Sequence, residues 1–183
     1  MSSSSEALMQ PGGTGPAENA RTCDPAYPPC IPMTFNVGVT GHRHLAAANR
    51  SALVDAVGRI LILIKQALAG AKGKPDLGLA TFSAEEPVRL RIVSSLAAGA
   101  DQIVAAAGLE LGYVLHCPLP FQRDQYALSF HDCAPQDAGD YRRLLDRAER
   151  VLELAGDYEK EPELAYLASG RVVVTYSDNL IAI

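Results

Sequence analysis

Apolar residues along the chain alternate between short β-branched runs and longer stretches with helical spacing. The first run, Thr34–Thr40 (TFNVGVT), lies between Pro32 and Gly41 and predicts a β-strand. After Ser51, a residue type that often caps helices, apolar residues recur every three or four positions up to Gly70. This apolar face consists of Leu53, Val57, Ile60, Leu61, Ile64 and Leu68. The pattern therefore predicts a strand followed by an amphipathic helix.

The same alternation of strand and helix patterns continues to the last residue. Three more strands are predicted, at Val88–Ser94, Tyr113–Cys117 and Leu180–Ile183. Three more helices are predicted, at Asp101–Leu111, Asp137–Ala148 and Glu163–Val174. Pro118 is expected to end the third strand, and Val151–Leu154 is either a short strand or the last turn of the preceding helix. Strands that alternate with helices imply right-handed crossovers, so we predict a doubly wound, mainly parallel α/β sheet with helices on both faces.

Two segments are too poor in large apolar side chains to join this core. Six of the chain's twelve prolines fall within Met1–Pro32, together with serine and glycine clusters, which predicts a disordered arm. Residues 33–183 then form one domain, interrupted by a polar connection at Ala71–Pro87. Because a buried strand at the last residue leaves no helix to cover the sheet, we expect the natural domain to continue beyond Ile183.

Charge and composition narrow the class of partner. Sixteen basic and 21 acidic residues give a net charge of -5, which disfavours a general polyanion binder, so nucleic acid is not the expected partner. The longest aliphatic run, Ile60–Ile64, is far shorter than the roughly 20 residues of a membrane span. The first residues do not resemble a signal peptide, which predicts a cytoplasmic protein. The pairs His116-Cys117 and His131-x-Cys133 are weak metal signals without a C-x-x-C pair, so neither metal nor cofactor is predicted.

The candidate chemistry lies in the two loops after the first two strands. In open parallel sheets, ligands bind at the carboxyl ends of the strands. The first loop opens with Gly41, which allows close backbone approach, and continues with His42 and Arg43, which can bind phosphate oxygens. The second loop, Ser94–Asp101 (SSLAAGAD), places small residues before a helix N-terminus, an arrangement that suits an anion. These loops predict an anion-bearing ligand.

Each of these residues also has a purely structural interpretation. Gly41 can serve the turn alone, and His42 with Arg43 can form a solvated loop. Asp101 fits a helix N-cap better than a catalytic acid on spacing alone. Ser95 lacks the G-x-S-x-G surroundings of a hydrolase nucleophile. The residues by themselves leave both interpretations open.

Four segments carry a resemblance to a known family. In chain order they are Val39–Arg43 (VTGHR), Ser94–Asp101 (SSLAAGAD), Pro118–Phe121 (PLPF) and Ser177–Ala182 (SDNLIA). Together they resemble the SLOG superfamily, the Rossmann-like group that links the DNA-uptake protein Smf/DprA with the LOG cytokinin-activating phosphoribohydrolases. The resemblance runs from the first strand to the end of the chain. It implies a Rossmann-like domain that binds a nucleotide or a nucleotide-derived small molecule.

The resemblance also implies which residues contact the ligand. They are Gly41, His42, Arg43, Ser94, Ser95, Gly99, Ala100 and Asp101, with Pro120 and Asp178 on the rim. This chain has Ser95 where relatives usually have glycine, which changes the shape of the turn. The glycine-rich phosphate loop and catalytic glutamate of the phosphoribohydrolases follow the strand that matches Leu180–Ile183, and this sequence stops before them.

The expected function is therefore binding or sensing of a nucleotide-derived small molecule. The alternative is an enzyme that cleaves a nucleotide N-glycosidic bond, with Asp101 or Asp178 assisting water. Single-stranded DNA binding is a third, less favoured function because of the acidic balance. A fused or separate effector, or a second copy that pairs through the last strand and the Asp137–Ala148 helix, is the expected macromolecular partner.

Overall fold

A parallel sheet of five strands forms the centre of the computed structural model, which describes residues 32–71 and 87–183. The strands are β1 (Thr34–Thr40), β2 (Arg89–Val93), β3 (Val114–Leu119), β4 (Arg150–Glu153) and β5 (Asn179–Ala182). Their order in the sheet is β4-β3-β2-β1-β5, and all four neighbouring pairs are parallel. The order reverses at β1, so the topological switch point lies between β1 and β5.

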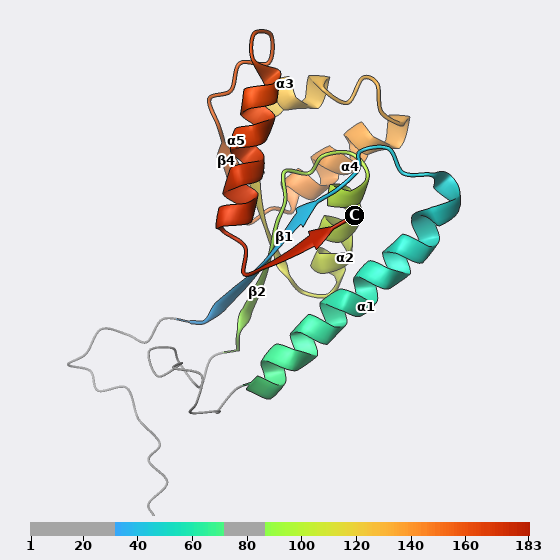
Figure 1. Cartoon of the computed structure of the whole chain (residues 1–183), viewed down its shortest axis with the longest axis vertical. Coiled ribbons are helices and arrows are strands. Elements are labelled where there is room, and N and C mark those ends of the chain that lie inside the picture. The colour runs from blue at the N-terminus through green and yellow to red at the C-terminus, as the bar shows by residue number, and fades with distance from the viewer. Residues whose placement is uncertain (1–31, 72–86) are drawn as a thin grey trace, which may run out of the picture. The chain divides into compact units, whose positions relative to one another are not determined.

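Helices cover both faces of this sheet, as Figure 1 shows. They are α1 (Ala47–Ala71), α2 (Ala100–Glu110), α3 (Arg123–Leu128), α4 (Pro135–Asp146) and α5 (Pro162–Thr175). Helix α2 packs on β1, β2 and β3 and is contacted by α1 and α4, whereas α5 packs on β1 and β3 from the opposite face. The predicted doubly wound α/β sheet is confirmed, and with it the Rossmann-like fold that the resemblance to the SLOG superfamily implies.

One part of the core lies between the sheet and the layer of α1 and α2. Strand β1 buries Val37 and Val39 on this face because alternate residues of a strand point to the same side. Helix α1 contributes Val57 and Leu61, which are four positions apart on one helical face. The hydroxyl of buried Tyr113 donates a hydrogen bond of 2.7 Å to the Leu61 carbonyl oxygen. This bond ties the start of β3 to the middle of α1.

Helix α1 begins earlier than the sequence pattern predicts. Ser51 was expected to cap it, but the helix starts at Ala47 and Ser51 lies exposed within it. The extra turn contains two alanines, the residue type with the highest helix propensity. The helix ends at Ala71, next to the predicted stop at Gly70.

Pro118 does not end the third strand, contrary to the prediction. Strand β3 continues through Pro118 to Leu119, and its last residues pair with β4. The His116 carbonyl oxygen accepts from the Ser94 amide on the β2 side, so the nitrogen of Pro118 also faces that side, where β2 has already ended at Val93. The missing N–H of proline therefore breaks no ladder hydrogen bond.

The remaining predictions concern shorter or undescribed segments. The open alternative at Val151–Leu154 is resolved in favour of a strand, β4. Helix α3 has no counterpart in the prediction, since six residues are too few for a periodic apolar pattern. The predicted disordered arm before Pro32 and nearly all of the connection at Ala71–Pro87 lie outside the described residues. None of the described helices is long and apolar enough to span a membrane.

Candidate functional site

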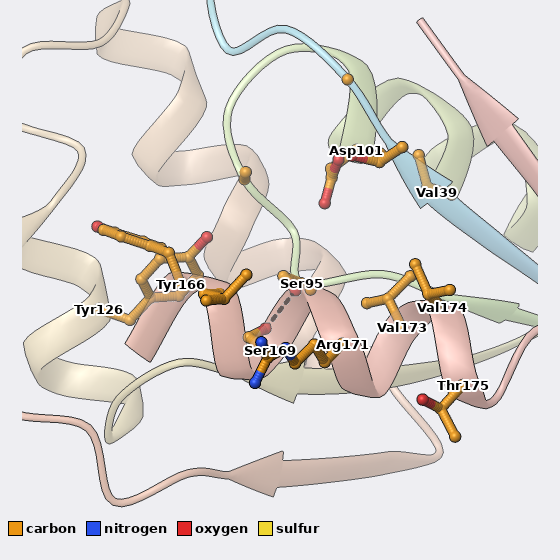
Figure 2. A pocket seen from close by; sticks show the side chains of 15 residues that line it. Val39, Ser95, Asp101, Tyr126, Tyr166, Ser169, Arg171, Val173, Val174 and Thr175 are labelled. Atoms are coloured by element: carbon orange, nitrogen blue, oxygen red, sulfur yellow. Dashed lines mark hydrogen bonds between the residues drawn. The ribbon is translucent and has the colours of Figure 1, made fainter. Parts of the chain in front are cut away.

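A cavity of about 490 Å³ lies at the carboxyl ends of β1 and β2, where α5 crosses the sheet (Figure 2). We call it the β1–β2 cavity. Three of the predicted site residues line it: Gly41, Ser95 and Asp101. The other side chains that shape it include Tyr126, Tyr166, Ser169 and Arg171, mostly from α5. The cavity therefore joins the two predicted loops to a helix that the sequence analysis did not include in the site.

The two loops are packed backbone to backbone through their glycines. Gly99 has a φ of +83°, and a Cβ atom there would lie 2.5 Å from the His42 carbonyl oxygen and 2.6 Å from that of Arg43. A Cβ on Gly41 would lie 2.5 Å from the Cβ of Ala100. The Ala100 amide donates to the His42 carbonyl oxygen at 3.2 Å. This first amide of α2 is thus engaged by the protein, so these residues hold the two loops together.

Asp101 is the buried carboxylate of the cavity, with 5% of its surface exposed. Gly99 is the N-cap of α2, so the interpretation of Asp101 as the N-cap is wrong: it lies in the first turn. Its carboxylate accepts a hydrogen bond of 3.1 Å from Ser94 Oγ and further bonds from the backbone amides of Ala97 and Ser95. Burial raises the pKa of Asp101 to about 6, although these hydrogen bonds act in the opposite direction.

Leu96 forms the turn in the loop that carries Ser94, Ser95 and Ala97. Leu96 has a φ of +58°, in the left-handed region, and its side chain is fully buried. Its amide donates to Ser94 Oγ at 3.1 Å. The left-handed conformation costs an L-residue about 1 to 2 kcal/mol, which the buried side chain and this hydrogen bond offset. Ser94 itself is fully buried and acts within the loop.

Ser95 begins a chain of hydroxyl groups that crosses the cavity. Its Oγ lies 2.6 Å from Ser169 Oγ, which in turn donates to the Pro118 carbonyl oxygen at 2.8 Å (Figure 2). A serine hydroxyl has one proton, so Ser95 must donate to Ser169. The remaining lone pairs of Ser95 Oγ are acceptors. The cavity therefore presents two acceptors, the hydroxyl of Ser95 in the loop and the carboxylate of Asp101 in the first turn of α2.

Aromatic and cationic groups complete the β1–β2 cavity. The rings of Tyr126 and Tyr166 have centroids 6.3 Å apart. Burial raises the pKa of Tyr126 well above its ordinary value, so its hydroxyl is protonated at neutral pH. Arg171 is exposed on α5 and lines the same cavity. The described residues contain no group of three or more His, Cys, Asp or Glu side chains placed to hold a metal ion.

Arg43 lies outside the β1–β2 cavity. Its Nη2 donates to the Ser129 carbonyl oxygen at 3.0 Å, and the guanidinium lies 6.0 Å from the centre of the Phe130 ring. Its Nε is buried and has no partner among the described residues. Arg43 lines an adjoining cavity of about 420 Å³, which shares Tyr166 with the β1–β2 cavity.

The other predicted site residues lie apart. His42 is exposed, and Pro120 is buried below the loop after β4, where its carbonyl oxygen would meet a Cβ on Gly156. Asp178 accepts hydrogen bonds from the amide and the side chain of Asn36, at 2.8 and 3.2 Å. Because β5 is parallel to β1, the residue that precedes it lies at the amino edge of the sheet, opposite the cavity. The structure therefore does not bring Pro120 or Asp178 to the cavity that Asp101 lines.

Comparison with known proteins finds a solved structure that is similar to this chain. No protein-family model matches the chain, and no curated protein matches it either. The X-ray structure of DNA processing protein A (DprA) from Streptococcus pneumoniae is similar, with 17% sequence identity and a TM-score of 0.48. The match covers 83% of this chain but 41% of that protein, so the chain spans less than half of its length.

Proposed function

We propose that the β1–β2 cavity binds a nucleotide-derived small molecule, and that the chain is a binding or sensing domain. The observation that carries this proposal is the pair of acceptors at the end of β2: the carboxylate of Asp101 and, beside it, the hydroxyl of Ser95. They lie at the carboxyl ends of the parallel strands, where open α/β sheets bind ligands. The volume of about 490 Å³ suits a small molecule.

The acceptors select a ligand that offers hydroxyl or amino donors. The Asp101 carboxylate has roughly four lone-pair sites, and donors from the loop occupy only some of them. A free lone pair of this carboxylate, together with Ser95 Oγ, can accept from two neighbouring hydroxyl groups. A ribose offers such a pair.

The rest of the cavity suits the other two parts of a nucleotide. Tyr166, half-buried at the boundary with the adjoining cavity, offers an aromatic face on which a base can stack. The guanidinium of Arg171 can pair with a phosphate, the role that the sequence analysis gave to Arg43. Gly41 lines the cavity through its backbone at the end of β1, because Ala100 and Ile183 fill the space that a side chain would take.

A thermal-shift screen tests this assignment, using nucleoside monophosphates, their nucleosides, NAD, ADP-ribose and cyclic nucleotides. A compound that binds only the native chain must raise the unfolding midpoint. We expect Arg171→Gln to weaken binding of the phosphorylated ligand roughly tenfold, because it removes a charge-assisted hydrogen bond. Binding of the nucleoside should not change. Arg142→Gln, an exposed site on α4, is the matched control.

Two results would count against the proposal in different ways. If no compound shifts the midpoint, the cavity does not take this class of ligand. If Arg43→Gln weakens binding and Arg171→Gln does not, the phosphate lies in the adjoining cavity rather than at α5.

The raised pKa of Asp101 favours a second candidate, hydrolysis of the N-glycosidic bond. A pKa of about 6 lets a carboxyl group exchange a proton near neutral pH, as a general acid or base must. In this case the bound nucleotide is expected to release its free base, and Asp101→Asn to abolish the release. Chromatography of the mixture measures it. If the ligand binds and is recovered intact, hydrolysis is excluded for that ligand and binding remains the proposed function.

A further inference from the structure

A second cavity, of about 510 Å³, lies on the α5 side of the sheet near the amino ends of the strands. We call it the arginine cavity. It is lined by Arg89 and Arg91 of β2, His116 of β3, Arg150 of β4 and the adjacent Glu149. Helix α5 packs on β1 and β3, and Val172 of this helix and its C-cap residue Tyr176 form part of the cavity wall. None of these residues belongs to the β1–β2 cavity.

The parallel register brings these charges together. Arg89 and Arg91 are two positions apart on β2, so they point to the same face. Arg150 is directly opposite His116 in the β3–β4 pair, and Arg91 is opposite Asn36 in the β1–β2 pair. Three arginines from two strands, β2 and β4, therefore line the same cavity on the α5 side of the sheet.

Positive charge exceeds negative charge in this cavity. Three arginines against one glutamate give 3 − 1 = +2 with His116 neutral, in a chain whose net charge is -5. Glu149 is already engaged, because its carboxylate lies 2.5 Å from Arg89 Nη2 and 3.3 Å from His116 Nε2. Arg150 makes no ion pair within the described part of the chain.

Arg91 and His116 are half-buried groups of this cavity. Arg91 Nη1 donates to Asn36 Oδ1 at 3.0 Å, but its Nε is buried and has no partner among the described residues. Burial lowers the pKa of His116, and the charges of Arg91 and Arg150 lower it further, against the hydrogen bond to Glu149. A bound anion would neutralise the arginines and reduce their repulsion of each other.

We propose that the arginine cavity is a binding site for a phosphomonoester dianion, separate from the β1–β2 cavity. The double negative charge matches the excess of two positive charges, and guanidinium groups bind phosphate oxygens in pairs. Leu152, Val172 and Tyr176 form an apolar wall beside the arginines, which suits a small organic group on the phosphate. The site goes beyond the proposed function, since it uses none of the same residues.

Nuclear magnetic resonance of the imidazole of His116 tests this site. Phenyl phosphate and inorganic phosphate are titrated at constant ionic strength, at a pH well above the second pKa of both, which is about 6 for a phosphomonoester and about 7 for inorganic phosphate. The site predicts a saturable shift of the His116 resonances. Arg150→Gln is expected to weaken phosphate binding roughly tenfold, and the exposed control Arg142→Gln to leave it unchanged.

The substitution Glu149→Gln should strengthen phosphate binding, a result that a poorly folded variant could not give. Removing the one carboxylate while keeping its shape is expected to tighten phosphate binding about fivefold, the effect of one unit charge on a dianion at roughly 8 Å in water. The proposal is overturned if chloride at equal ionic strength shifts the His116 resonances as much as phosphate does. It is also overturned if Arg150→Gln and Arg142→Gln have the same effect, or if Glu149→Gln does not tighten binding.

Discussion

The substitution Gly99→Ala is expected to lower the free energy of unfolding by about 3 kcal/mol. The φ of +83° costs an L-residue about 1 to 2 kcal/mol, and crowding adds a similar amount. The crowding is with backbone, because the new Cβ would lie 2.5 and 2.6 Å from the carbonyl oxygens of His42 and Arg43. Those atoms cannot move without separating the loops that form the β1–β2 cavity. Urea unfolding followed by circular dichroism measures the loss.

Gly139→Ala in α4 is the matched control for this prediction. A Cβ at Gly139 would meet nothing within 4 Å, and its position is helical, so alanine should stabilise the protein by about 0.5 to 1 kcal/mol. The same change at two glycines thus has opposite signs. If Gly99→Ala costs no more than the backbone conformation alone, about 1 to 2 kcal/mol, the loops are not packed as described.

The ionisation of Asp101 is expected to reduce stability by about 3 kcal/mol between acidic and neutral pH. Burial raises the pKa of Asp101 from its ordinary value of 3.8 to about 6, a difference of roughly two units at about 1.4 kcal/mol each. Between these values the folded chain binds more protons than the unfolded chain, so stability falls as pH rises. The contribution is present in full below about pH 4 and is lost as pH passes 6.

Asp101→Asn isolates this contribution. Other carboxyl groups make stability rise with pH, because their partners lower their pKa values. These groups are Glu149, Glu153 and Asp157. Their effects are common to the variant and the parent, so the difference in slope between the two proteins belongs to Asp101. The quantity compared is the slope from urea unfolding at several pH values, whatever the absolute stability of the variant. Equal slopes between pH 4 and 6 would contradict the burial of this carboxyl.

The sequence was sufficient to predict the layers of the fold but not the directions of its polar side chains. Thr34–Thr40 and the other strands are short apolar runs whose period reports burial directly. Arg43 was correctly placed after the first strand, yet its direction depends on the Ser129 carbonyl oxygen and the Phe130 ring, more than 80 residues later in the chain. Such a contact exists only after folding. The local pattern of residues around Arg43 contains no sign of it.

The α5 wall of the cavity was missed for a related reason. The helix pattern at Glu163–Val174 was found, but Tyr166, Ser169 and Arg171 enter the site because the crossover from β4 carries α5 beneath the ends of β1 and β2. No local signal marks that crossing. Asp178 was assigned to the rim from its motif, whereas the strand direction places it at the amino edge. Knowing which end of a strand a residue occupies requires the final pairing of the sheet.

A titration followed by nuclear magnetic resonance shows whether the β1–β2 cavity binds a nucleotide-derived molecule. The compound with the largest thermal shift is added to the isotope-labelled chain while the backbone amide resonances are followed. The amides of Ser95 and Ala97, which donate to Asp101, are expected to move in a saturable way, and Gly41 with them. Resonances of Arg91 and Arg150 in the arginine cavity should not follow the same curve. Saturable movement confined to residues outside the β1–β2 cavity would contradict the account.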